Sequence, residues 1–171
     1  GDIGGVTAIN AEVPYTIGYY AKDRVNLSQA VADVLDGVGC HGGFDRDGLY
    51  QMWRLNDPVS GTSAASIPDD QIQEGGVSIR SRELPAKNIR IRYKKNWTVQ
   101  NADALAGAVT AADRDLYSSD GAIAQATDLS IATAHLLAES PDVLESYLYT
   151  TANAATEVAR WLALRGATRT V

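Results

Sequence analysis

The sequence has few of the residues on which covalent, metal or acid–base chemistry usually depends. Among its 171 residues there is one cysteine, Cys40, and there are two histidines, His41 and His135. A single cysteine excludes an intrachain disulfide and a zinc site built from cysteines. No apolar run approaches the roughly 20 residues that a membrane helix needs. The sequence therefore predicts a chain with no membrane span, no metal and no cofactor.

Positive charge is in the minority in this chain. It has 15 Lys and Arg against 21 Asp and Glu, for a formal net charge of −6. Nucleic-acid-binding proteins usually show an excess of basic residues, so this balance argues against general nucleic-acid binding. The hydrophobic share of 45% lies in the ordinary globular range, and the length allows one domain with its own core.

The first half of the chain predicts an extended arm, a helix and a hairpin. The arm or strand is the Tyr- and Thr-rich stretch 14–23. A helix follows in 26–39, where Asn26 can cap the first turn, Gln29 holds the reciprocal position, and Gly37 ends the helix. Its apolar face would hold Leu27, Val31, Val34, Leu35 and Val38. In 42–55, a turn between two apolar arms predicts a β-hairpin; the turn residues are Asp45, Arg46, Asp47 and a Gly48 with positive φ.

The middle of the chain predicts a loop and a pair of strands. Residues 56–76 contain two prolines and several glycines and read as a loop, with a short strand near 65–67. The alternating segments 75–84 and 87–100 are expected to pair as antiparallel strands around Pro85.

The second half is richer in alanine and predicts helices between short strands. Thr110 with Asp113 would cap a helix over 111–119, and a strand is expected near Ile123. Residues 143–150 predict an extended piece. A helix is expected over 151–166, ended by Gly166, and a new strand begins in 167–171. The shared face of that helix would hold Ala155, Val158, Ala159 and Leu162.

These patterns together predict an α+β fold: antiparallel strands and hairpins with two to four short helices packed against them. We expect residues 1–171 to form one compact module cut from a larger protein, because the last strand starts and breaks off. A subdivision is possible between a helix–hairpin part, 1–60, and a sheet-plus-helix part, 77–171.

No pattern in the sequence forms a convincing catalytic site. Cys40 and His41 are adjacent, so on a strand their side chains would point to opposite faces, and His135 lacks a nucleophile-elbow glycine pattern. Carboxylate pairs of the kind that glycosidases use are Asp69 with Asp70 and Asp113 with Asp115. Surface and helix-cap roles explain these acids more simply, so we expect no enzyme, with a cell-wall glycosidase as an alternative.

The strongest chemical signal is the basic strand within 87–100. Ile89, Ile91 and Tyr93 would point to the core while the intervening basic residues point outward. The predicted interaction surface consists of Arg90, Arg92, Lys94, Lys95 and Trp97. Binding of single-stranded nucleic acid through this strand is a second alternative, but it would need more exposed aromatic residues. A solvated face, or a face paired with acids of another subunit, is favoured.

Several stretches, in this order, resemble the tail-hub or baseplate-hub proteins of long-tailed phages, prophages and related tail-like particles. The first is the helix and "GFDRDG" hairpin of 27–55. The others are "IRIRYKKNWTVQ" followed by "LAGAV", then "ATAHLLAESP", and "ATEVARWLALRG" before a strand. Together they lie between residues 15 and 171.

The resemblance implies a structural role in a virion tail or tail-like particle. Such hubs form a ring, commonly a homotrimer, that joins the tail tube to the host-recognition or penetration apparatus. The partners it implies are the tail tube, tape-measure, fibre or tip proteins. It carries over no catalytic residue, and synthesis would take place in the bacterial cytoplasm.

Overall fold

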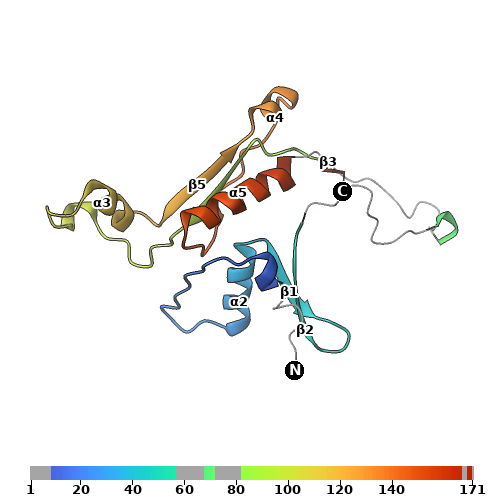
Figure 1. Cartoon of the computed structure of the whole chain (residues 1–171), viewed down its shortest axis with the longest axis horizontal. Helices are drawn as coiled ribbons and strands as arrows, with labels where there is room; N and C mark the ends of the chain where they lie inside the picture. Colours follow the sequence, from blue (N-terminus) through green and yellow to red (C-terminus); the bar gives the residue numbers. More distant parts are fainter. Residues whose placement is uncertain (1–8, 57–67, 72–81, 167–168, 171) are drawn as a thin grey trace.

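A computed structural model describes residues 9–56, 68–71, 82–166 and 169–170, and it has the predicted α+β fold. Residues 9–12 are helical, and the other helices are α2 (Leu27–Asp36), α3 (Ala111–Ser118), α4 (Leu129–Ala134) and α5 (Thr151–Gly166), with 3-10 turns at Asp69–Gln71 and Ala102–Ala104. The strands are β1 (Cys40–Phe44), β2 (Tyr50–Arg54), β3 (Arg82–Glu83), β4 (Asn88–Tyr93), β5 (Ala122–Thr127), β6 (Leu144–Glu145) and β7 (Arg169–Thr170). Figure 1 shows α5 lying along a small central sheet, while α3, α4 and the β1–β2 hairpin extend away from it. The expected strand at 65–67 lies outside the described residues.

Helix α2 and the β1–β2 hairpin form as the sequence predicts. The Asn26 side chain accepts a hydrogen bond from the Ser28 amide, and Gly37 ends the helix. Glycine is required there because an added Cβ would lie 2.9 Å from the Ser146 Cα. Gln29 donates to Asp33 at 2.7 Å and does not reach back to the cap, which corrects the expected reciprocal contact. The prediction also placed Leu27 on the buried face of the helix, but Leu27 lies in the first turn and is 78% exposed.

The hairpin turn is held by one carboxylate. Asp45 accepts from the amides of Asp47 and Leu49, at 2.9 and 2.8 Å, and from the Gln51 side chain at 3.1 Å. Gly48 has the positive φ of 75° that the turn predicted. These bonds fix the register in which Phe44 faces Tyr50.

The central sheet has the order β5-β4-β6, with β4 in the middle. Its β4 alternates as the sequence predicts: Ile89 and Ile91 are fully buried and Tyr93 is nearly so. Strand β5 pairs with β4 antiparallel, and β6 pairs with it parallel. The strand near Ile123 is thereby confirmed, and the extended piece after residue 143 contributes β6.

The predicted pairing of 75–84 with 87–100 is wrong where the structure describes it. Strand β3 pairs antiparallel with β7 at the far end of the chain, while β4 is hydrogen-bonded on both sides by β5 and β6. Pro85, fully buried, and the bridge from Ala86 to Glu139 turn the chain out of β3 before β4 begins. The two segments therefore belong to different sheets.

Short polar caps start α3 and α4. Asp113 donates its amide to the Thr110 hydroxyl at 3.2 Å, and that hydroxyl donates to the Asp113 carboxylate at 2.7 Å. The Asp128 carboxylate accepts from the Ser130 amide at 2.9 Å. The first cap confirms the predicted helix over 111–119.

Helix α5 packs against both β4 and β5. The helix is confirmed, but its predicted buried face is only partly right. Val158 is buried, Ala155 and Ala159 are exposed, and Leu162 is half-buried. The residues of α5 that are buried instead are Ala154, Glu157 and Leu164. The inward face is thus rotated relative to the predicted stripe, and it brings a carboxylate into the core.

Two hydrophobic clusters meet at α5. One joins the arm and hairpin to the sheet and contains Val13, Leu35, Val38, Cys40, Tyr93, Leu148 and Ala154. The other contains Ala86, Ile89, Ile91 and Val158. The first cluster takes residues from both parts of the expected subdivision, and the division into 1–60 and 77–171 stays a prediction.

Glu157 is fully buried where the arm, the hairpin and α5 meet. Its carboxylate accepts from Arg54 of β2 at 2.5 Å and from the Arg160 Nε at 3.0 and 3.1 Å. The Tyr15 hydroxyl lies 3.4 Å from the same carboxylate. Arg160 then donates to the Leu55 and Val38 carbonyls, at 2.6 and 3.2 Å. One buried carboxylate thereby connects the arm, β2 and α5, three segments that are distant in sequence.

The substitution Glu157→Gln should lower the free energy of unfolding by about 3 kcal/mol, because it removes the carboxylate that pairs with the buried Arg54 guanidinium and with the mostly buried Arg160 guanidinium. Urea unfolding followed by circular dichroism measures the change. Glu145→Gln is the matched control: Glu145 is half-exposed and pairs with Arg92 at 2.8 Å, so its loss should cost about 1 kcal/mol or less. Equal effects of the two substitutions would contradict the role given to Glu157.

Acid should weaken the hairpin through Asp45. Hydrogen bonds from Gln51, Leu49 and Asp47 lower the pKa of Asp45 from its ordinary value of 3.8. The folded state therefore binds the proton less readily, so the stabilisation is complete above pH 3.8 and is lost as the pH falls through the lowered pKa. Asp45→Asn should destabilise the chain at pH 7, with the difference from wild type shrinking below pH 3.8. In urea titrations, a difference that grows on acidification, or one matched by Asp47→Asn, would contradict this.

Candidate functional site

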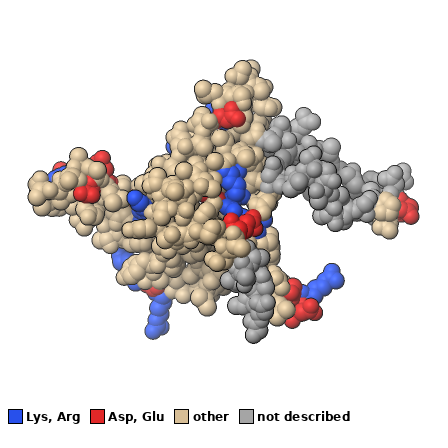
Figure 2. Space-filling model, in the orientation of Figure 1, with Lys and Arg blue, Asp and Glu red and all other residues tan. Residues whose placement is uncertain are grey.

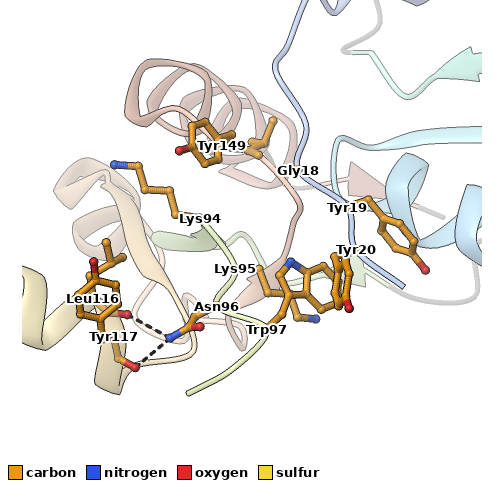
Figure 3. A pocket seen from close by; sticks show the side chains of 11 residues that line it. Gly18, Tyr19, Tyr20, Lys94, Lys95, Asn96, Trp97, Leu116, Tyr117 and Tyr149 are labelled. Carbon is orange, nitrogen blue, oxygen red and sulfur yellow. Dashed lines mark hydrogen bonds between the residues drawn. The ribbon is translucent and has the colours of Figure 1, made fainter. Parts of the chain in front are cut away.

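A hollow of about 430 Å³ lies where the chain leaves β4. Four segments line it: the N-terminal arm, the turn after β4, the end of α3 and the segment after β6. Figure 3 shows the side chains of Trp97 and Tyr20 on one side of the hollow and those of Tyr149 and Leu116 on the other. The remaining lining residues are Gly18, Tyr19, Lys94, Lys95, Asn96, Tyr117 and Leu148.

A turn at Lys94 and the side chain of Asn96 build this hollow. Lys94 has a φ of 50°, a left-handed conformation that turns the chain out of the strand. The Asn96 amide donates to the carbonyls of Leu116, Tyr117 and Ser119 at 3.3, 3.0 and 3.1 Å. Its oxygen accepts from the Thr98 amide at 3.0 Å. Figure 3 shows two of these bonds joining the turn to the end of α3.

Aromatic rings form the wall beside the arm. The rings of Trp97 and Tyr147 stack nearly parallel, with centroids 5.6 Å apart. Tyr19 meets both edge-on, at 5.8 and 5.0 Å, and Tyr20 meets Trp97 edge-on at 6.1 Å. Tyr20 and Tyr149 remain more than half exposed, so ring surface is open to a bound group.

Two ammonium groups and no carboxylate belong to the lining. The Lys95 ammonium lies 5.0 Å from the Trp97 centroid and 5.1 Å from that of Tyr147, within the range of cation–π attraction. Burial, together with the negative charge of Asp33, raises the pKa of the Tyr147 phenol. This shift moves the pKa further from neutral pH, so the positive groups in the lining at neutral pH are the ammonium groups of Lys94 and Lys95.

The structure divides the predicted interaction surface in two. Lys94, Lys95 and Trp97 line the hollow, whereas Arg90 and Arg92 lie on β4 at the sheet. Arg92 pairs with Glu145 at 2.8 Å and lies 3.7 Å from Asp120, so much of its charge is met within the chain. The Arg90 Nε is buried without a hydrogen-bond partner among the described residues. The predicted basic stripe is thus not a continuous row of free charges.

The other sequence candidates have ordinary structural positions. The Cys40 thiol is buried, contacts the Val38 carbonyl at 3.8 Å and has its pKa raised by burial. His41 points outward, half-exposed, with Asp36 3.7 Å away. Asp113 accepts a hydrogen bond from Thr110, the residue that caps α3, and Asp70 and Asp115 are exposed. Within the described residues, no three His, Cys, Asp or Glu side chains gather as metal ligands.

The arrangement of the hollow suits binding. Open ring faces accept a planar or apolar body, and two lysines attract a negative group attached to it. The sequence identified Lys94, Lys95 and Trp97 but missed Tyr19, Tyr20, Tyr147 and Tyr149. The composition did contain a clue to these rings, because the chain has eight Tyr and one Phe. Tyrosine is favoured at surfaces that are partly apolar and partly wet.

Tyr147 should titrate above the ordinary phenol value of 10.0, because burial and Asp33 oppose its ionisation. Ultraviolet difference titration of wild type against Tyr147→Phe isolates its phenolate absorbance. Tyr20→Phe, at the exposed rim, is the matched control. A Tyr147 midpoint at or below pH 10.0 would contradict the partly buried position of this ring beside Asp33.

Comparison with known proteins adds no relative to these observations. No family model matches the chain, and no curated protein matches it. Among the helices of the described ranges, none is long and apolar enough to cross a membrane. The chemistry of the site therefore follows from its own residues: an aromatic hollow with two lysines, which lies at the end of β4 and is joined to the end of α3 by Asn96.

Proposed function

We propose that this chain is a structural module of a phage-type tail tip, joining a tail tube to the apparatus that contacts the host. The observation that carries the proposal is the exposure of large apolar side chains on the projections of the fold. Leu136 and Leu137, beyond α4, are 92% and 75% exposed, and Phe44 on the hairpin is 77% exposed. In Figure 1 both regions extend away from the central sheet.

Such exposure favours an assembled state. Exposed apolar patches of this kind usually mark contacts with other proteins. Figure 2 shows the region around α4, at the top of the view, as mostly uncharged surface. Charged side chains would keep such a projection in water, so a tip formed by leucines is better suited to a protein neighbour.

The core beneath these projections supports a scaffold role. Helix α5, the hairpin and β4 are joined through Glu157 and a shared apolar cluster, so a contact at a projection is transmitted to a packed body. Several kinds of assembly could use such a scaffold. The stretches that form the hairpin, β4 and α5 resemble tail-hub proteins in sequence and in order, and this resemblance favours a tail tip. Tube, tape-measure, fibre and tip proteins are the proposed partners, and the full-length hub would be a homotrimer.

Localisation in the particle tests the proposal. A gold-labelled antibody against the chain, viewed by electron microscopy, should mark the end of the tail. Leu136→Asp with Leu137→Asp should reduce incorporation of the chain at least tenfold, because a charge in an apolar contact costs more than about 1.4 kcal/mol. The matched control is Leu27→Asp, which makes the same change at a side chain that is 78% exposed on α2.

Label on the capsid, or only on protein outside particles, would rule out the tail-tip role. Wild-type incorporation of the double variant would instead rule out the α4 tip as a contact. The chain purified with each substitution should keep its circular dichroism spectrum, since all three leucines are exposed.

A further inference from the structure

The outer edge of β5 presents backbone groups without partners in the described structure. Ser146 donates to the Arg92 carbonyl, so the backbone groups of Arg92 face β6, and those of Ile91 and Tyr93 face β5. The pairing of Ile91 with Ala124 then directs the backbone of Ile123, Gln125 and Thr127 away from β4. No hydrogen bond to these outward groups occurs within the described ranges.

The β5 edge also lacks the usual protection against strand addition. Edge strands are commonly guarded by lysines, prolines, bulges or short length. Strand β5 has six residues, "AIAQAT", with no charge and no proline, and it follows β4 in unbroken register. The opposite side of the sheet is less open to strand addition, because the segment after β6 is bridged to the arm through Ile17 and Leu148.

We propose that two copies of this chain pair through their β5 edges, antiparallel and centred on Gln125, to form one continuous sheet. In this register Gln125 lies opposite its own counterpart, and Ile123 lies opposite Thr127. Each of these facing pairs can exchange two backbone hydrogen bonds. The Gln125 amides can also bond to each other, and Asp128 would face Ala122, so no like charges oppose one another.

The position of α5 favours a second copy as the partner. The helix packs on both β4 and β5, and we infer from this that its axis runs over the pair, roughly midway between the two strands. With strands about 4.8 Å apart, a two-fold axis beside β5 places the two α5 axes about 9.6 Å apart. Packed helices lie about 8 to 10 Å apart, so the two helices would meet without a gap.

The flank of α5 beside β5 fits that approach. Ala159 and Ala163 line a groove of about 430 Å³ together with Ala126 of β5, Ile131 of α4 and the Asp128 that caps α4. Both alanines are exposed in the single chain. Their small side chains allow the second helix to come close, and pairing would cover the alanine side of this groove in both copies.

A charge exchange at Gln125 tests the pairing on the whole chain. This two-fold contact is a separate interface from the three-fold contact proposed for the hub, so either one can fail without the other. Sedimentation equilibrium should show wild type as a dimer. Gln125→Lys and Gln125→Glu should each raise the dimer dissociation constant about tenfold or more, because like charges then lie opposite each other at the two-fold axis. An equimolar mixture of the two variants should restore the dimer as a heterodimer.

Gln100→Lys is the matched control, since Gln100 is exposed and lies outside the strands, and it should leave the dimer unchanged. Circular dichroism checks that each variant keeps its fold. A monomeric wild-type chain would overturn the proposal and leave the edge to a strand of another protein. A dimer unaffected by either charge, or one that the mixture fails to restore, would overturn it as well.

Discussion

The buried carboxylate of Glu157 is the constraint on which the arrangement of this chain depends. A lone charge in an apolar interior is very costly, so the carboxylate is tolerated only with Arg54, Arg160 and Tyr15 beside it. Those partners come from the arm, β2 and α5, and Arg160 also binds the carbonyls of Val38 and Leu55. Apolar residues alone would allow several packings of the hairpin against α5, whereas the forked geometry of the guanidinium groups selects one. The projections, the hollow and the open edge of β5 all depend on that fixed body.

Local patterns were enough to predict much of the fold. The Asn26 and Thr110 caps, the turn with Gly48 and the alternation of Ile89, Ile91 and Tyr93 are each encoded within a few residues, and each formed as predicted. The pairings were harder to predict. Strands β3 and β6 have two residues each, and their partners lie far away in sequence, so neighbouring alternating segments suggested a false pair. Helix α5 shows the same limit, because a stripe of alanines at helical spacing cannot reveal that a glutamate turns inward toward distant arginines.

The candidate site was predictable only in its basic half. Lys94, Lys95 and Trp97 follow directly from the strand that the sequence identified, but the facing rings of Tyr19, Tyr147 and Tyr149 come from the arm and the segment after β6. Only the fold brings them together, through the bridge between Ile17 and Leu148 and the turn at Lys94. The same three-dimensional information explains why Arg92 is not part of the hollow: Glu145 of β6 neutralises it at the sheet. Counting the basic residues along a strand therefore overestimates the positive charge that a ligand would meet there.

Native-state hydrogen exchange tests most directly the claim that Glu157 makes the hairpin and the sheet one body. Amides that open only by global unfolding share one free energy of opening, whereas a separable unit opens at a lower one. The protected amides of β2 and those of β4 are predicted to exchange with the same free energy. That free energy should equal the one measured by urea unfolding. Exchange of the β2 amides at a clearly lower free energy than those of β4 would contradict the account, because it would show that the hairpin separates while α5 and the sheet stay folded.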